Sequence, residues 1–319
     1  MPERLRTPWW LAGAHLQTIY PLLRKPAAIP LRRERLETPD GDFIDCDWLA
    51  EGPADAPLVV LFHGLEGSSK SHYALSLMHA LKQRGWRGVV PHFRGCSGEP
   101  NRLSRAYHSG DSAEVGWILG QVHACAGAAP MFAAGVSLGG NALLKWLGEQ
   151  EQAANRFLSG AMAICPPLDL TVSGHALARG FNRIYTRHFL GTLKPKALAK
   201  LERFPELFDR QRMLSARTLH DFDDVYTGPV HGFGGADDYW RRASSRQWLR
   251  GITVPTRLLT ASNDPFVPPA ALPTVTEYSV HLQHHHTTSG GHVGFITGAF
   301  PGSLAWLGSR ALDFFERSC

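Results

Sequence analysis

The chain has 319 residues, of which 44% are hydrophobic and 19% are charged. This composition is that of an ordinary globular protein, and the length suits one large α/β domain with an insertion or two small domains. The net charge of +5 comes from interrupted clusters such as Arg32-Arg33-Glu34-Arg35, and no basic run is interleaved with aromatic residues. The sequence therefore does not predict nucleic-acid binding.

Five cysteines are scattered along the chain without a C-x-x-C pair, which predicts neither a disulfide framework nor a zinc site. The first residues, Met1 to Arg4, do not resemble a secretory signal. No apolar run approaches the roughly eighteen residues that a membrane span needs. We therefore expect a cytoplasmic protein without stable membrane insertion.

Strands and helices are predicted in alternation along the chain. A leading antiparallel hairpin is expected at residues 34–37 and 42–49, around Asp40-Gly41. Mostly apolar runs predict further strands at residues 58–62, 88–91, 131–136, 161–165, 256–260 and 278–282. Helical patterns cover residues 73–84, 111–123, 141–150 and 303–317, the second with Asp111 or Ser112 as its N-cap. This alternation predicts a mostly parallel sheet flanked by helices.

One interval of some eighty residues, from Leu168 to about Arg250, shows no strand signal. We interpret residues 168–250 as a helical lid inserted into a core made of residues 1–167 and 251–319. The lid's large apolar residues either line an acyl pocket or form a small core of the lid itself, and we expect the second for most of them. They are Phe181, Tyr185, Phe189, Leu190, Phe204, Leu207 and Phe208.

The strongest functional signal is Gly135-Val136-Ser137-Leu138-Gly139. It reads G-x-S-x-G and lies between the predicted strand 131–136 and the helix-forming run 141–150. A strand, a tight glycine-flanked turn and a helix are what a nucleophile elbow requires. We therefore predict that Ser137 is a nucleophile whose hydroxyl stands above the sheet edge.

A nucleophilic serine needs a base, and the base needs a group that fixes its tautomer. Asp264 comes just after the predicted strand 256–260, and His292 lies in the glycine-rich loop 289–295. Both follow Ser137 in the order Ser, Asp, His that accompanies such an elbow. We predict that His292 is the base and that Asp264 orients it.

Other acidic and histidine residues compete for these roles. Four aspartates inside the lid are weaker candidates than Asp264, namely Asp209, Asp221, Asp223 and Asp224. The run His284-His285-His286 competes with His292 and resembles a metal-binding cluster. Neighbours in an extended chain point to alternating sides, and no carboxylate at a useful spacing accompanies the run. We therefore predict no metal site, and we place these histidines at a strand end and in a solvated loop.

The third part of such a site stabilises the oxyanion. Phe62-His63-Gly64-Leu65 follows the first buried strand, and a loop of this kind donates one backbone N–H to the developing charge. The second donor comes from the residue after the nucleophile. We predict the backbone N–H groups of Leu65 and Leu138 as the two donors.

With these residues the chain resembles the YheT-like branch of the α/β-hydrolases, which includes plant embryogenesis-associated proteins and mammalian membrane-anchored hydrolases. The resemblance covers nearly the whole chain. It is carried by Trp9-Trp10-Leu11, His15-Leu16-Gln17-Thr18 and residues 63–68, 93–98, 107–110, 264–266 and 290–295. It implies an α/β-hydrolase fold and a serine esterase or acyltransferase that needs neither metal nor organic cofactor. It also places the triad at Ser137, Asp264 and His292.

Two departures from the branch bear on function. The sequence lacks the leading hydrophobic segment of the membrane-anchored relatives, and no histidine is followed five places later by aspartate, as an H-x-x-x-x-D acyltransferase signature requires. We expect a carboxylesterase that hydrolyses small short- to medium-chain esters through an acyl-enzyme on Ser137. Acyl transfer to an alcohol, a peptidase or thioesterase activity, and a non-catalytic binding module are the alternatives.

His15 and His108 lie in branch-typical motifs but have no role in the triad, and we expect them to make structural hydrogen bonds. The natural substrate and the choice between monomer and homodimer stay open at this level.

Overall fold

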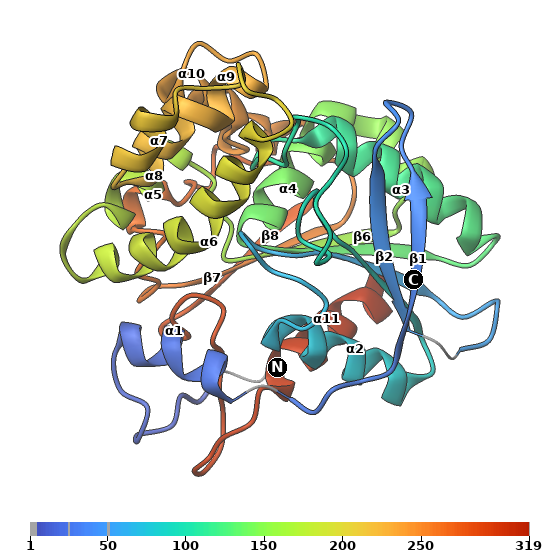
Figure 1. Ribbon diagram of the computed structural model, residues 1–319. Helices are drawn as coiled ribbons and strands as arrows, with labels where there is room; N and C mark the ends of the chain where they lie inside the picture. The colour runs from blue at the N-terminus through green and yellow to red at the C-terminus, as the bar shows by residue number, and fades with distance from the viewer. Residues whose placement is uncertain (1–4, 25, 50–51, 319) are drawn as a thin grey trace.

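The computed structural model describes residues 5–24, 26–49 and 52–318, so Cys319 and the first four residues lie outside it. Its centre is an eight-stranded sheet in the order β1-β2-β4-β3-β5-β6-β7-β8 (Figure 1). β2 pairs antiparallel with β1 and with β4, and all other neighbours are parallel. This confirms the α/β-hydrolase fold with its leading hairpin. The strands are β1 (Leu31–Glu37), β2 (Phe43–Leu49), β3 (Leu58–Phe62), β4 (Arg87–Pro91), β5 (Met131–Val136), β6 (Gly160–Ile164), β7 (Thr256–Ala261) and β8 (Leu282–Thr287).

Helices cover both faces of the sheet because its central strands are apolar on both sides. In β3, Leu58 and Val60 pack with α3 (Ser112–Ala126) and α4 (Leu138–Gln150). The alternate residues Val59 and Leu61 pack with α2 (His72–Arg84) and α11 (Ala305–Phe315) on the opposite face (Figure 1). The four helices agree with the predicted ones to within a few residues.

The prediction of the last strand was wrong. We expected residues 278–282, whereas β8 spans Leu282–Thr287 and contains all three consecutive histidines. A polar run is tolerated there because β8 is an edge strand and its neighbour offers hydroxyl groups. Thr260 Oγ1 lies 2.7 Å from both His284 Nε2 and His286 Nδ1. All three histidines are therefore strand residues and not members of a solvated loop, and His284 and His286 are hydrogen-bonded to the neighbouring strand.

Between β6 and β7 the structure is helical throughout. The elements are α5 (Leu170–Leu177), α6 (Arg183–Leu201), α7 (Arg210–Ser215), α8 (Leu219–Phe222), a π-helical turn (Asp223–Thr227), α9 (Gly228–Val230) and α10 (Ala236–Ala243). They gather on one side of the sheet (Figure 1). Short 3₁₀ turns complete the chain at Glu151–Arg156, Gly180–Asn182, Arg246–Gly251, Pro269–Ala271 and Glu316–Ser318.

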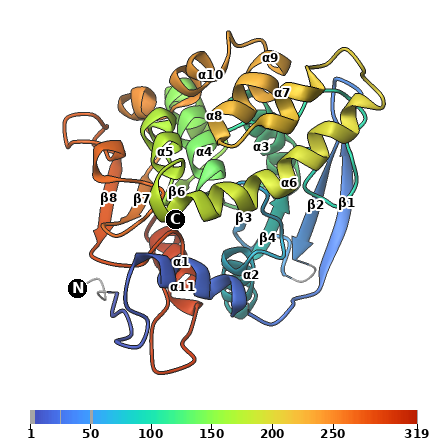
Figure 2. The same cartoon turned by 60° about the vertical axis from the view of Figure 1, so that its left-hand side comes forward.

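The remaining helix, α1 (Ala14–Leu23), was not predicted from the sequence. Figure 2 shows it below α6, which runs from α1 toward the hairpin of β1 and β2. Within the described part of the chain no helix is both long and apolar enough to cross a membrane. The four described cysteines, Cys46, Cys96, Cys125 and Cys165, are free thiols.

Candidate active site

Ser137 occupies the sharp turn between β5 and α4. Its backbone lies at φ 51° and ψ −119°, a conformation that costs a non-glycine residue about 1–3 kcal/mol. The turn closes tightly because a side chain is absent on both sides. A Cβ on Gly139 would lie 2.5 Å from the carbonyl oxygen of Phe62, and one on Gly135 would lie 2.6 Å from the carbonyl oxygen of Gly139. The G-x-S-x-G stretch therefore forms the elbow geometry expected from its sequence.

The three predicted triad residues meet at this turn. Ser137 Oγ lies 2.9 Å from His292 Nε2, and His292 Nδ1 lies 2.9 Å from Asp264 Oδ2. The Asp264 side chain is only 2% exposed, and it also accepts hydrogen bonds from the backbone N–H groups of Phe266 and Val267. The ring of Phe266 stacks on His292 at a centroid distance of 4.2 Å. This chain of contacts fixes the imidazole with one nitrogen on the carboxylate and the other on the hydroxyl.

The competing residues lie elsewhere. Asp209 caps α7, Asp221 belongs to the capping box of α8, and Asp224 pairs with Arg212. The carboxylate of Asp223 accepts a hydrogen bond from Trp240 Nε1. None of these four carboxylates contacts His292 among the described residues.

One described group has the composition of a metal site: the ligand atoms of Cys165, Asp264 and His292 lie within 4.8 Å of one another. Burial and the nearby Asp264 carboxylate raise the pKa of the Cys165 thiol well above its ordinary value. The thiol is therefore neutral and a poor metal ligand. The other two groups are already engaged with each other and with Ser137.

Two backbone N–H groups of the loop His63–Gly67 donate to tyrosine hydroxyls. The N–H of Gly64 donates to Tyr73 Oη and the N–H of Glu66 donates to Tyr107 Oη. Within the described residues no acceptor is found for the N–H of Leu65 between them, nor for the N–H of Leu138 at the start of α4. Both leucines line the cavity that holds Ser137. Neither N–H therefore has an acceptor among the described residues, and their role as oxyanion donors stays a prediction.

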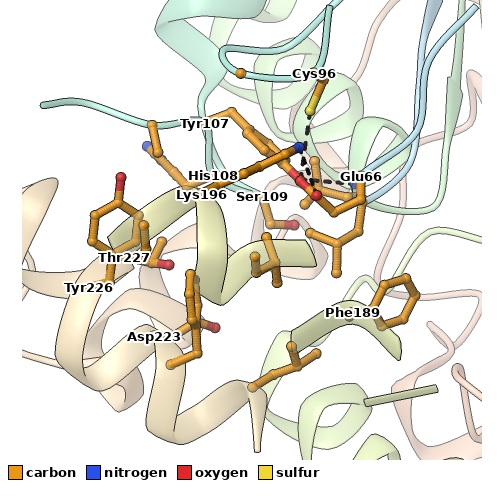
Figure 3. Close-up of a pocket in the computed structure, with 18 of the residues that line it drawn as sticks. Glu66, Cys96, Tyr107, His108, Ser109, Phe189, Lys196, Asp223, Tyr226 and Thr227 are labelled. Carbon is orange, nitrogen blue, oxygen red and sulfur yellow. Dashed lines mark hydrogen bonds and ion pairs between the residues drawn. The ribbon is translucent and has the colours of Figure 1, made fainter. Parts of the chain in front are cut away.

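Tyr107 and Glu66 hold this loop in place (Figure 3). The Tyr107 hydroxyl accepts from the Glu66 N–H at 3.0 Å and donates to the Glu66 carboxylate at 2.9 Å. Glu66 also pairs with Lys196 of α6, with 2.7 Å between Oε2 and Nζ. The helical segment is therefore tied by an ion pair to the loop that carries the N–H of Leu65.

His63 is buried and neutral in the same loop. Its Nε2 accepts from the Phe93 N–H at 3.1 Å and its Nδ1 donates to the Gly64 carbonyl at 2.8 Å, so both nitrogens are used by one neutral tautomer. Burial lowers the pKa of His63 to about 3. Burial likewise lowers the pKa of His108 to about 3, and its Nδ1 accepts from the Gly110 N–H.

The α1 helix buttresses the loops that carry Asp264 and His292. Gln17 Oε1 accepts from the Gly290 N–H at 2.8 Å and from Asn263 Nδ2 at 2.9 Å. Thr18 Oγ1 accepts from the His292 N–H at 2.9 Å. Gln17 and Thr18 belong to the branch-typical stretch whose role the sequence did not disclose, and the only hint was that two polar residues stand in an otherwise apolar segment.

His15 of α1 contacts the helical segment. Its Nδ1 lies 3.1 Å from Tyr185 Oη, and its ring packs against Phe181. Tyr185 in turn packs against Phe266, the residue stacked on His292. His15 and His108 both make hydrogen bonds of the kind expected for them.

A cavity of about 600 Å³ opens at Ser137. Its walls come from the loops after β3, β4 and β5, from the helical segment and from His292. Most of the large residues lining it are apolar: Leu65, Tyr107, Leu138, Leu170, Leu177, Phe189, Leu193, Leu219, Phe222, Tyr226, Tyr239, Trp240 and Phe266. Of the seven large lid residues singled out from the sequence, Phe189 alone lines the cavity. Of the rest, Leu190, Leu207 and Phe208 pack in a cluster formed mostly by the helical segment, whereas Tyr185 packs with Phe266 and Val267 of the core.

Comparison with known protein families supports the fold described above. Residues 57–299 match the alpha/beta hydrolase fold family. The protein is 40% identical over 309 residues to the putative esterase YheT of Escherichia coli, covering 95% of this chain and 90% of that one. The chain belongs to the YheT-like branch of the α/β-hydrolase family.

More distant members of this family are recognisable too. This chain is 29% identical to the mouse phospholipase ABHD3, over 93% of this chain and 74% of that protein. Among solved structures, the Pyrococcus furiosus esterase Pf2001 is similar in fold, with a TM-score of 0.56, 14% identity and 99% of both chains covered. Family and fold thus agree on a hydrolase scaffold.

Proposed function

We propose that this α/β-hydrolase is a serine carboxylesterase with Ser137 as nucleophile. The observation that carries the proposal is the unbroken chain of contacts from Ser137 Oγ through the His292 imidazole to the buried Asp264 carboxylate, with 2.9 Å at each step. This arrangement fulfils the geometric requirement for an activated serine. The relation to a putative esterase and to a phospholipase supports an ester as substrate.

The reaction follows from the positions of the groups. Ser137 Oγ attacks the ester carbonyl while His292 Nε2 takes its proton, and Asp264 stabilises the resulting imidazolium. The N–H groups of Leu65 and Leu138 stabilise the oxyanion. His292 then passes the proton to the departing alkoxide. A water molecule activated by His292 attacks the acyl-enzyme, which releases the acid and restores Ser137.

The cavity indicates the substrate class. Its volume of about 600 Å³ and its aliphatic and aromatic walls suit an acyl chain of short to medium length. Much of that wall belongs to residues 168–250, which we propose act as a lid on a core made of residues 1–167 and 251–319. The ion pair between Lys196 of this lid and Glu66 couples lid position to the oxyanion loop.

Labelling with a fluorophosphonate probe tests the proposal without knowledge of the natural substrate. We expect one adduct, on Ser137, in the wild type and none in Ser137→Ala. We also expect p-nitrophenyl butyrate turnover to fall by about 10⁴-fold or more in that variant while it stays folded. A folded wild type that neither reacts with the probe nor turns over esters would overturn the proposal.

The same assay separates hydrolysis from acyl transfer. A short alcohol is added to the ester reaction, and acid and new ester are quantified. Excess acid supports an esterase. New ester in excess of acid would assign the acyl-enzyme to a transferase instead, the alternative that the missing H-x-x-x-x-D signature disfavours.

A further inference from the structure

One carboxyl group in the cavity wall is used by no part of the proposed reaction. Asp223 opens the π-helical turn Asp223–Thr227 between α8 and α9, and it lines the same cavity as Ser137. Turns of this kind inside helices occur often at functional sites. Figure 3 shows Asp223 and Thr227 on the helical segment, across the pocket from Glu66 and Tyr107.

Asp223 differs from Glu66 and Lys200, two other charged groups around the cavity, which are satisfied within the protein. Glu66 pairs with Lys196, and Lys200 Nζ donates to the carbonyl oxygens of Leu103 and Ser104. Asp223 accepts a hydrogen bond from Trp240 Nε1 at 2.8 Å and is also hydrogen-bonded to the Thr227 side chain, but among the described residues no cationic side chain lies within ion-pair distance. Burial raises its pKa to about 6, so at neutral pH it is largely a carboxylate without a countercharge.

A second polar group in the wall of the same cavity has no hydrogen-bond partner among the described residues. Ser173 of α5 lines the cavity, is only 3% exposed, and its hydroxyl makes no hydrogen bond to the described residues. Trp240 contacts both segments that carry these groups: its ring packs so closely on Gly174, the neighbour of Ser173 in α5, that a Cβ there would lie 2.4 Å from the ring, while its Nε1 donates to Asp223. Buried polar groups are normally hydrogen-bonded and buried charges are normally paired, so a carboxylate without a countercharge and a hydroxyl without a hydrogen-bond partner in one ligand cavity point to a ligand that bonds to them.

We propose that Asp223 and Ser173 form a polar subsite that binds a hydrogen-bond donor, a hydroxyl or an ammonium group, on the ester substrate. The proposal rests on the proposed esterase function, which makes the cavity a substrate site. The carboxylate accepts the donor's hydrogen, and the Ser173 hydroxyl contributes a second hydrogen bond. The apolar walls bind the hydrocarbon part between this subsite and Ser137. A site built to bond a polar group discriminates strongly against the analogue that lacks it.

Matched esters test the subsite. One series consists of p-nitrophenyl esters from hexanoate to decanoate that end in a methyl, hydroxyl, dimethylammonium or isopropyl group, the last being the neutral match for dimethylammonium. A second series carries the same ends on the alcohol side of butyrate esters. For each pair kcat/KM is measured on the wild type and the dissociation constant on Ser137→Ala, which binds the ester without cleaving it. At the best chain length we expect the donor-bearing ester to be preferred by about tenfold or more.

Variants assign the preference to residues. Asp223→Leu and, separately, Ser173→Ala are expected to reduce the preference while turnover of the methyl-ended esters stays within about threefold of the wild type. Asp223→Asn distinguishes the two donors, because an amide oxygen still accepts from a hydroxyl but no longer attracts a cation. Asp224→Asn is the control: it changes the neighbouring carboxylate, which pairs with Arg212 and does not line the cavity.

The outcomes are separable. Turnover of plain esters without a preference in either series would overturn the subsite and leave the esterase standing. A preference that survives both Asp223→Leu and Ser173→Ala would overturn the assignment to these residues. A binding preference on Ser137→Ala without any wild-type turnover would support the subsite and refute the esterase. If Asp223→Leu fails to fold because it loses the hydrogen bond to Trp240, Ser173→Ala still tests the subsite.

Discussion

The hydrogen bond between Thr18 and the backbone of His292 offers a direct test of whether α1 sets the position of the base. Thr18→Val keeps the shape of the side chain but removes the oxygen that accepts from the His292 N–H at 2.9 Å. Thr18→Ser keeps that oxygen and removes only a methyl group. Because Thr18 does not line the cavity, neither change touches the substrate. The pair therefore isolates the Thr18 hydroxyl, which also donates to the Ala14 carbonyl oxygen at 2.8 Å within α1.

The expected effect follows from the fate of the abandoned N–H. A buried donor left without an acceptor costs about 1–3 kcal/mol. If the loop stays in place, this cost appears as lost stability toward unfolding. If the loop shifts to reach another acceptor, the cost appears as misplacement of His292 relative to Ser137. A loss of 1–3 kcal/mol of transition-state stabilisation corresponds to a fall of about 5- to 150-fold in kcat. Gly291 makes a large shift difficult, because a Cβ there would already lie 2.8 Å from Thr18.

The measurement combines kinetics and unfolding. We expect kcat for p-nitrophenyl butyrate to fall within that range in Thr18→Val, with KM changed by less than about twofold. Thr18→Ser should recover most of the loss. Urea unfolding of both variants gives the share of the cost borne by stability. A Thr18→Val protein that folds, loses stability and keeps the wild-type kcat would refute the idea that α1 positions the base.

Further predictions concern the oxyanion loop, the elbow and acid stability. Tyr107→Phe should lower kcat by about tenfold with little change in KM, because the Glu66 N–H loses its acceptor; an unchanged kcat would contradict this. Gly139→Ala should cost about 3 kcal/mol of unfolding free energy or more, whereas Gly120→Ala, where a Cβ meets nothing within 4 Å, should cost none; equal urea midpoints would refute the packing argument. Since burial lowers the pKa of His63 to about 3 while an unfolded histidine titrates near 6.5, the unfolded chain binds more protons between these values. The free energy of unfolding therefore decreases as the pH falls through this window, by up to about 1.4 kcal/mol per pH unit. His63→Gln should weaken this pH dependence in urea titrations, and a variant with the same pH dependence as the wild type would contradict the prediction.

Much of the fold was readable from the sequence because its central strands are short, apolar and bounded by turn residues. The elbow could be predicted for a different reason. Its tight turn requires two glycines at a fixed spacing, because a Cβ atom at either position would collide with neighbouring backbone, and few other structures have this requirement. Asp264 and His292 were found from their places after predicted strands. The structure brings both of them to Ser137.

The failures have physical causes. The strand β8 was misplaced because its polarity comes from histidines whose nitrogens are satisfied by Thr260, a partner that only the folded sheet supplies. The helix α1 was missed because it contains Pro21 and buries a glutamine, which no helical pattern predicts. Asp223 was set aside among four lid aspartates, since its distinguishing property, a place in the cavity wall without a cationic partner, depends on tertiary structure.

The position of α1 has a consequence for how the minimal working enzyme is delimited. The stretch that matches the family begins at residue 57, after α1 and after the hairpin of β1 and β2. A protein trimmed to residues 57–299 would retain Ser137, Asp264, His292 and both oxyanion donors. It would nonetheless lack the side chains of Gln17 and Thr18 that fix the histidine loop. In this protein the stretch matched by the fold family therefore does not include every residue that holds the loop of His292.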